Sequence, residues 1–240
     1  MKQIVHDTYT EMSVKTADQI AAIISKKPEA LFCFPAGETS IGTFEQLISL
    51  NKSGKISFKK CKIVGLDEWA NIGKMESENC FSFLKKHLFD DIDYCEETMC
   101  FFDGESSDLE LECIRTDNFI KKNGPIDMIL LGMGMNGHLG LNEPGTPFDL
   151  YSHIVNLDET TKAVGQKYFT GKTELSKGIT LGLKYIKEAR TVILQVNGER
   201  KAEVAKRFID SEISPSFPAS IIKMHPDSYF LLDKEAAKYL

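Results

Sequence analysis

The chain has 240 residues, 42% of them hydrophobic and 27% charged, as in an average globular protein. Its net charge of −6 argues against a protein that binds nucleic acid along a basic surface, although it leaves room for a local phosphate pocket. No stretch approaches the roughly 20 apolar residues of a membrane span, and the N-terminus lacks the apolar core of a signal peptide. We therefore expect one continuous domain over residues 1–240, located in the cytoplasm.

Six cysteines are spread over the first half of the chain, and none of them forms a C-x-x-C pair. They are Cys33, Cys61, Cys80, Cys95, Cys100 and Cys113. This spacing does not fit a zinc ribbon or a thioredoxin-type motif. We expect six reduced thiols, as in cytoplasmic proteins.

Short apolar runs alternate with helical patterns along the chain. Uninterrupted apolar runs are typical of strands buried on both faces of a parallel sheet. The predicted strands span residues 30–34, 61–66, 126–134, 191–196 and 229–232. Apolar residues at helical spacing predict helices over residues 12–24, 41–48, 81–88 and 202–208. This alternation predicts an α/β fold with a doubly wound, mostly parallel, Rossmann-like sheet.

Ligands of such sheets bind beyond the carboxyl ends of the strands, so the turns that follow the strands are candidate sites. The first is residues 35–40. There, Gly37 would let the backbone approach a ligand, and the hydroxyls of Thr39 and Ser40 at a helix start suit a phosphate. Alternatively, Thr39 or Ser40 only caps the helix. The negative charge of Glu38 would repel a bound anion unless its side chain points away from the site.

The second turn begins with two acids directly after a buried strand. Side chains of adjacent residues diverge, so we expect at most one of Asp67 and Glu68 to enter a pocket. Asp67 is a plausible general base if partial burial brings its pKa near neutrality. In the alternative interpretation, Asp67 caps a following turn and Trp69 packs over it.

The third turn, residues 132–145, contains five glycines together with Asn136, His138, Asn142 and Glu143. A histidine and a glutamate on such a turn can form a proton-handling pair, in which the carboxylate orients the imidazole. The alternative is a histidine with a purely structural role in the turn. Two such ligands fall short of the three that a metal site needs, so we expect no metal.

The fourth turn follows the strand at residues 191–196. Lys201, at the start of the next helix, could reach a phosphate as a point charge. On its own it could equally be a solvated surface lysine.

Taken together, these turns resemble the glucosamine-6-phosphate deaminase/isomerase family, whose superfamily includes 6-phosphogluconolactonase. The resemblance extends from about Phe34 to Leu232. Its most specific segment is residues 137–144, Gly-His-Leu-Gly-Leu-Asn-Glu-Pro. The deaminases have G-H-[IL]-x-[FL]-N-E-P there, whereas the lactonases lack N-E-P, which favours an amino-sugar phosphate over a lactone.

The resemblance implies catalytic roles. Asp67 matches the base that moves a proton between C2 and C1 of the open-chain sugar. His138 matches the acid/base that opens the ring, and Glu143 matches its carboxylate partner. Asn136 stands where the best-known glucosamine enzymes have aspartate.

The resemblance also implies a phosphate site. The positions that match the phosphate cradle are Gly37, Glu38, Thr39 and Lys201. Lys167 lies near the position at which many members carry an arginine on a mobile lid. In this chain the corresponding lid would be about residues 146–175. Glu38 departs from the usual glycine or serine, and Trp69 from the usual tyrosine.

The implied reaction converts a hexosamine 6-phosphate to a ketohexose 6-phosphate and ammonia, with no cofactor. The stretch Leu-Asp-Glu-Trp at residues 66–69 and the N-G-H motif look most like the galactosamine-6-phosphate branch, so galactosamine 6-phosphate is the expected substrate. The alternatives are glucosamine 6-phosphate, then lactone hydrolysis, then a non-catalytic sugar-phosphate sensor.

The expected partner is thus a small-molecule sugar phosphate, with no nucleic acid and no membrane. Hexameric members have a longer C-terminal tail and an arginine-containing stretch after the N-E-P turn. Residues 151–154 contain no arginine. We therefore expect a monomer rather than a homo-oligomer.

Overall fold

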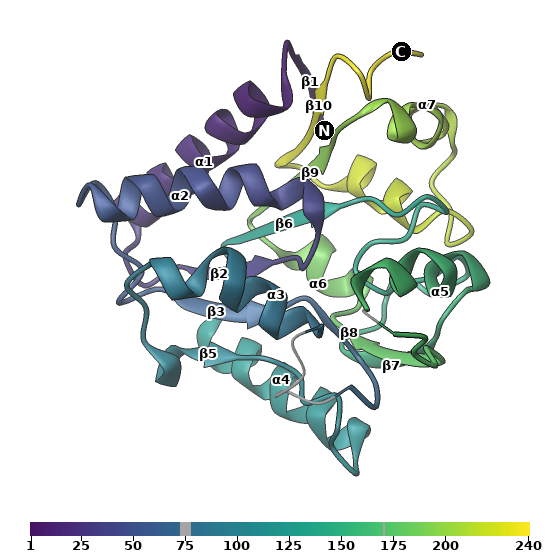
Figure 1. Cartoon of the computed structure of the whole chain (residues 1–240), viewed down its shortest axis with the longest axis horizontal. Helices are drawn as coiled ribbons and strands as arrows, with labels where there is room; N and C mark the ends of the chain where they lie inside the picture. Colours follow the sequence, from purple (N-terminus) through teal and green to yellow (C-terminus); the bar gives the residue numbers. More distant parts are fainter. Residues whose placement is uncertain (73–77, 170) are drawn as a thin grey trace.

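The computed structural model describes residues 1–72, 78–169 and 171–240. A seven-stranded sheet lies at its centre (Figure 1). Across the sheet, its strands are β1 (Lys2–His6), β10 (Ser228–Asp233), β9 (Thr191–Val196), β6 (Met128–Gly132), β2 (Leu31–Phe34), β3 (Lys62–Gly65) and β5 (Met99–Cys100). All neighbouring strands run parallel. The predicted doubly wound parallel sheet is confirmed.

Helices cover both faces of this sheet (Figure 1). On one face lie α1 (Tyr9–Lys26), α2 (Ile41–Lys52) and α3 (Cys80–His87). On the other lie α4 (Leu109–Asn123), α6 (Leu183–Glu188), α7 (Ala202–Asp210) and the 3-10 helix η6 (Pro218–Met224). Side chains alternate between the faces: Phe32 and Phe34 of β2 pack under the first layer, Leu31 and Cys33 under the second. No helix among the described residues is long and apolar enough to cross a bilayer.

A second, antiparallel sheet stands beside the carboxyl end of the first. It contains β4 (Asp67–Trp69), β8 (Lys177–Thr180) and β7 (His153–Asn156) in that order. The sequence predicted a turn at residues 67–69. These residues instead form a strand, because their backbone pairs with β8, with Asp67 opposite Thr180. Between β7 and β8 the chain forms α5 (Glu159–Gly165) and the 3-10 helix η4 (Gln166–Tyr168). A separate apolar cluster packs this region: Trp69, Ile72, Cys80, Leu141, Leu157, Phe169 and Leu175.

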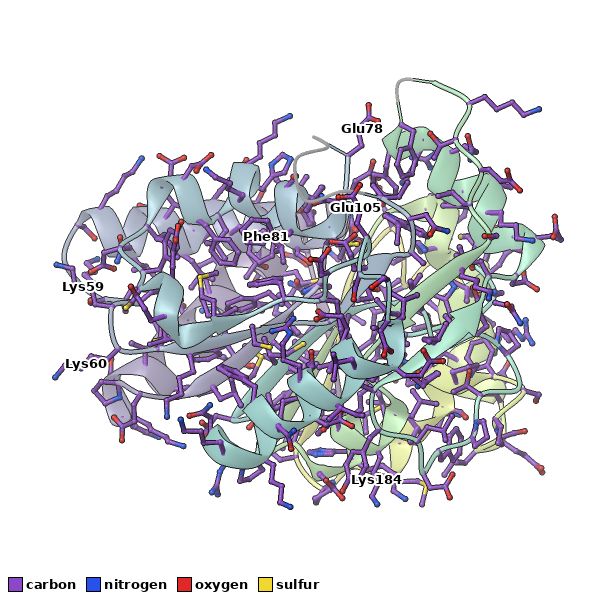
Figure 2. All side chains as sticks on the ribbon, turned by 90° about the horizontal axis from the view of Figure 1, so that it is seen from below. Lys59, Lys60, Glu78, Phe81, Glu105 and Lys184 are labelled. Carbon is purple, nitrogen blue, oxygen red and sulfur yellow. The ribbon has the colours of Figure 1, made fainter. Side chains whose placement is uncertain are left out.

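The four candidate turns follow four adjacent strands, β9, β6, β2 and β3. From β2 the chain continues outward to β3, and from β6 it continues outward to β9 in the opposite direction. The switch point between β2 and β6 is where open α/β sheets bind ligands. Figure 2 shows Lys59 and Lys60, which precede β3, projecting at the end of the molecule opposite the green segments around α5. The candidate site therefore lies at the α5 end of the sheet.

Candidate active site

The four turns converge on one pocket at the carboxyl ends of the central strands. Seven predicted site residues line it: Gly37, Glu38, Thr39, Asp67, His138, Lys167 and Lys201. Asn136 and Glu143 are not in its lining, but both belong to the hydrogen-bonded network around His138. Helix α5 and η4 complete the wall with Thr160, Thr161, Val164, Gly165 and Tyr168.

The two adjacent acids of β4 have different surroundings, as expected. Asp67 is half-buried and lines the pocket. Glu68 is buried, and its carboxylate accepts backbone N–H bonds from Trp69 (2.9 Å), Cys80 (2.9 Å) and Phe81 (3.1 Å). Glu68 thereby fastens the N-terminus of α3 to β4, which leaves Asp67 as the acid that faces the pocket.

Burial raises the pKa of Asp67 to about 7, and the negative charge of Glu68 adds to this shift. The carboxylate is thus a base poised near neutral pH. Its surroundings leave no room for a side chain at Gly140, where a Cβ would lie 3.5 Å from Asp67 Oδ2 and 2.8 Å from Thr180 Oγ1. Gly140 also has a φ of +58°, which favours glycine. This glycine lets the third turn pass directly beside the base.

The ring of His138 lies against the backbone of the same turn. A Cβ on Gly134 would lie 2.4 Å from the imidazole atoms Cε1 and Nε2, so only glycine leaves space for the ring there. His138 Nδ1 is 3.1 Å from Thr161 Oγ1 on α5 and 3.5 Å from Glu143 Oε2. The sequence predicted Glu143 as the partner of the imidazole. In the structure the hydroxyl of Thr161 lies nearer to Nδ1 than the Glu143 carboxylate does.

Glu143 is buried among hydrogen-bond donors. Its Oε2 accepts from Asn136 Nδ2 at 2.9 Å, and its Oε1 accepts from the Asp158 backbone N–H at 3.2 Å. Burial acts to raise the pKa of Glu143, but the neighbouring side chains of His138, Thr161 and Asn136 outweigh it and lower this pKa. Glu143 is therefore a stable carboxylate at neutral pH. Asn136 joins this network through Glu143 and the His138 backbone N–H (3.1 Å).

The first turn forms the 3-10 helix η1 (Glu38–Ser40), which leads into α2. The alternative in which a hydroxyl caps this helix does not hold: Ser40 makes no side-chain capping bond, and Thr39 Oγ1 donates to Asn197 Oδ1 at 2.6 Å. The first N–H groups of a helix have no intrahelical partner. Those at Gly37 to Thr39 belong to residues that line the pocket.

Two lysines bring positive charge to this end of the pocket. Lys201 Nζ donates to the Met133 carbonyl at 2.5 Å. Burial, together with the nearby charge of Lys167, lowers the pKa of Lys201 to about 8. An anion bound beside such a buried ammonium group stabilises it, because the negative charge favours the protonated form that burial disfavours.

Glu38 is accommodated by an ion pair. Its Oε2 lies 2.9 Å from Lys167 Nζ on η4, which joins the first turn to the α5 region. The glutamate that seemed to oppose an anion therefore has its charge balanced by Lys167. The other lysine, Lys201, remains available to a phosphate.

Sequence reasoning missed the contribution of α5, above all Thr161 and Asp158. Asp158 accepts from the Thr160 backbone N–H at 2.8 Å and caps α5. An aspartate before Glu-Thr-Thr is a typical helix start, so the helix could have been predicted from this signal. Its contact with His138 could not, because no fixed spacing links the two segments.

Comparison with known sequences identifies the family. A family model described as glucosamine-6-phosphate isomerases/6-phosphogluconolactonase matches residues 6–230. A glucosamine-6-phosphate deaminase of Bacillus pumilus is 40% identical over 227 residues, which cover 94% of each chain. One of Clostridium botulinum is 34% identical over 241 residues, covering 100% of this chain and 99% of the relative.

Solved structures give the same picture. A structure described as a monomeric glucosamine-6-phosphate deaminase superposes with a TM-score of 0.96 at 34% identity, covering 100% of both chains. A 6-phosphogluconolactonase of Thermotoga maritima shares the fold, with a TM-score of 0.75 at 15% identity over 97% of this chain and 98% of its own. The chain belongs to the family of glucosamine-6-phosphate isomerases and 6-phosphogluconolactonases.

Proposed function

We propose that this protein is a hexosamine-6-phosphate deaminase/isomerase that converts glucosamine 6-phosphate and water to fructose 6-phosphate and ammonia. The observation that carries the proposal is a single pocket that holds a near-neutral carboxylate, a histidine supported by a buried network and a desolvated lysine. The names of the relatives favour glucosamine 6-phosphate over the galactosamine epimer that the motif at residues 66–69 suggested.

We assign ring opening to His138. A neutral imidazole nitrogen takes the proton of the C1 hydroxyl and delivers it to the ring oxygen. The C1–O5 bond breaks, a C1 aldehyde forms, and the ring oxygen becomes a hydroxyl. Glu143 stays ionised throughout, so its negative charge stabilises the imidazolium that forms between the two proton transfers.

Isomerisation falls to Asp67. The C2 proton is acidified by the adjacent aldehyde, and the Asp67 carboxylate removes it. The C1 oxygen takes up a proton from the ammonium group of the substrate, which gives a neutral enolamine. The same carboxyl returns the proton to C1, which leaves an imine at C2. Water adds to this imine, and ammonia leaves from the resulting carbinolamine. A base with a pKa near 7 can both accept and donate this proton at neutral pH.

The phosphate site is proposed at the first turn, where Lys201 and residues 37–39 line the pocket and the backbone N–H groups at the helix start suit an anion. We also propose residues 146–175 as a lid, because α5 and η4 supply one wall of the pocket. A substrate phosphate would then compete with Glu38 for Lys167. A monomer is the proposed state, as described for the structural relative, and light scattering in solution would test it.

The proposed reaction is tested by ammonia release from glucosamine 6-phosphate and galactosamine 6-phosphate under identical conditions. We expect a kcat/KM at least about tenfold higher for glucosamine 6-phosphate. A preference for the galactosamine epimer would restore the assignment from residues 66–69. Hydrolysis of 6-phosphogluconolactone without ammonia release from either amino sugar, or binding without turnover, would overturn the proposal.

Replacing Lys201 with alanine should raise KM for the phosphorylated sugar by roughly tenfold or more and change kcat by less than about threefold. The phosphate is remote from the reacting carbons, so its contacts contribute mainly uniform binding. Steady-state kinetics checks this, with Lys59→Ala as the matched control because Lys59 projects from the opposite end of the molecule (Figure 2). An unchanged KM would make Lys201 a structural lysine only.

The pH dependence of kcat follows from Asp67. Because the base acts in its ionised form and burial raises its pKa to about 7, kcat should rise with pH and reach half its plateau near pH 7. The measurement is made at saturating substrate between pH 5 and pH 8, so that ionisation of the substrate phosphate affects only KM. A kcat that is flat across this range would contradict the assignment.

A further inference from the structure

Helix α5 is tied to the network around His138 by its first residues. Asp158, the N-cap of α5, donates its backbone N–H to Glu143 Oε1 at 3.2 Å, and its Oδ1 lies 3.4 Å from Asn136 Nδ2. Thr161, within the first turn of the helix, is only 3% exposed. Its Oγ1 lies 3.1 Å from His138 Nδ1. The start of α5 therefore contacts every polar member of this network.

The direction of the hydrogen bonds follows from counting protons. A threonine hydroxyl has one hydrogen to donate, while an ionised carboxylate can only accept. Glu143 Oε2 lies 3.5 Å from His138 Nδ1, and the negative charge of this carboxylate favours a proton on that nitrogen. Across the 3.1 Å contact the imidazole then donates from Nδ1 to the threonine oxygen. Glu143 Oε2, at 3.5 Å from Nδ1, is too far for a good N–H···O bond.

We propose that Thr161 is a positioning residue for His138: its hydroxyl accepts a hydrogen bond from the imidazole and, beside the Glu143 carboxylate, holds His138 as the Nδ1–H tautomer. In a neutral imidazole the other nitrogen, Nε2, is then the acceptor. This is the form that can take a proton from a ligand, since His138 lines the pocket. The kinetic consequence rests on the proposed function; the tautomer itself does not.

Helix α5 has two roles at the site. Val164 and Gly165 of α5 line the pocket, and Thr161 orients the imidazole within it. The imidazole therefore takes its reactive tautomer only when α5 is seated against the third turn. Ring opening is in this way coupled to the position of the pocket wall.

Thr161→Val and Thr161→Ser separate the hydroxyl from the bulk of the side chain. Valine keeps the size and removes the hydroxyl, so kcat for the hexosamine phosphate should fall at least tenfold. Serine should stay within about threefold of the wild-type value. Deuterium exchange at C1 of the ketohexose phosphate should change less than threefold in both variants, because its open-chain form does not need ring opening by the enzyme. Thr116→Val, a buried threonine on α4 outside the pocket, is the control.

The direct readout is ¹⁵N NMR of histidine-labelled protein without substrate, recorded over a range of pH and evaluated for the neutral form of the imidazole. The His138 resonances are assigned by comparison with His138→Gln. We expect a protonated Nδ1 and an unprotonated Nε2 in wild type and Thr161→Ser, and loss of this preference in Thr161→Val. A valine variant that keeps the Nδ1–H signature overturns the proposal, whatever its activity. Absence of ammonia release by the wild type would instead defeat the proposed function and leave this measurement intact.

Discussion

Asp67→Asn is expected to lower kcat by about 10²–10⁴-fold, the usual contribution of a general base. Asparagine preserves the size of the side chain but cannot accept the C2 proton at any pH of interest. Neighbouring Glu68 cannot replace this carboxylate, because it accepts hydrogen bonds from three backbone N–H groups, and Glu38 is paired with Lys167. Binding should change little, since the phosphate is proposed to bind at Lys201 and residues 37–39.

Two measurements accompany this variant. Calorimetric titration with fructose 6-phosphate should give a dissociation constant within about threefold of the wild type, and the melting temperature should show that the variant folds. Asp93→Asn is the matched control, because Asp93 is a partly buried carboxylate that accepts hydrogen bonds from Ser57 and Phe58 outside the pocket. A loss of kcat smaller than tenfold would remove Asp67 as the base.

His138→Gln should slow ammonia release from the ring-closed hexosamine phosphate by about 10²-fold or more. Glutamine can hydrogen-bond to the sugar but cannot shuttle the proton from the C1 hydroxyl to the ring oxygen. The C2-to-C1 proton transfer, which we assign to Asp67, should persist. Deuterium exchange at C1 of fructose 6-phosphate measures that second step separately.

The ratio of the two rates is decisive for His138. If exchange falls as far as ammonia release, His138 is not confined to ring opening and the division of roles is wrong. His153→Gln serves as the control, because His153 lies on β7 outside the pocket lining and its ring Nδ1 is hydrogen-bonded to the Tyr151 carbonyl (2.9 Å). It should leave both rates unchanged.

The central strands were predictable because their apolar character is written in short, unbroken runs. β2 and β6 are buried on both faces and no polar residue interrupts their patterns, whereas within β9 the buried Gln195 follows a run of three apolar residues. The edge strand β1 was missed, since four of its five residues are exposed and only pairing with β10 holds it as a strand. α4 was missed because the exposed Leu111 and Ile114 blur its buried face.

Some features of the candidate site could likewise be predicted from the sequence, and others could not. Its turns could be found from glycines and polar residues that directly follow buried strands, which placed Asp67, His138 and Lys201 in one pocket. Contacts between distant segments could not. Lys167 reaches Glu38 across 129 positions, and Thr161 reaches His138 across 23, with no fixed spacing to reveal either pair.

The position of β1 has a consequence for how the chain folds as it is made. β1 lies at the edge of the sheet, and its single neighbour there is β10, with Lys2 opposite Tyr229. β1 precedes the other strands of this sheet in the chain, and its backbone can pair only after residues 228–233 have been made. Contacts across such long sequence separations form slowly. The β2–β3 region can pair while the rest of the sheet is still being translated, whereas this edge of the sheet closes only after β10 has been made.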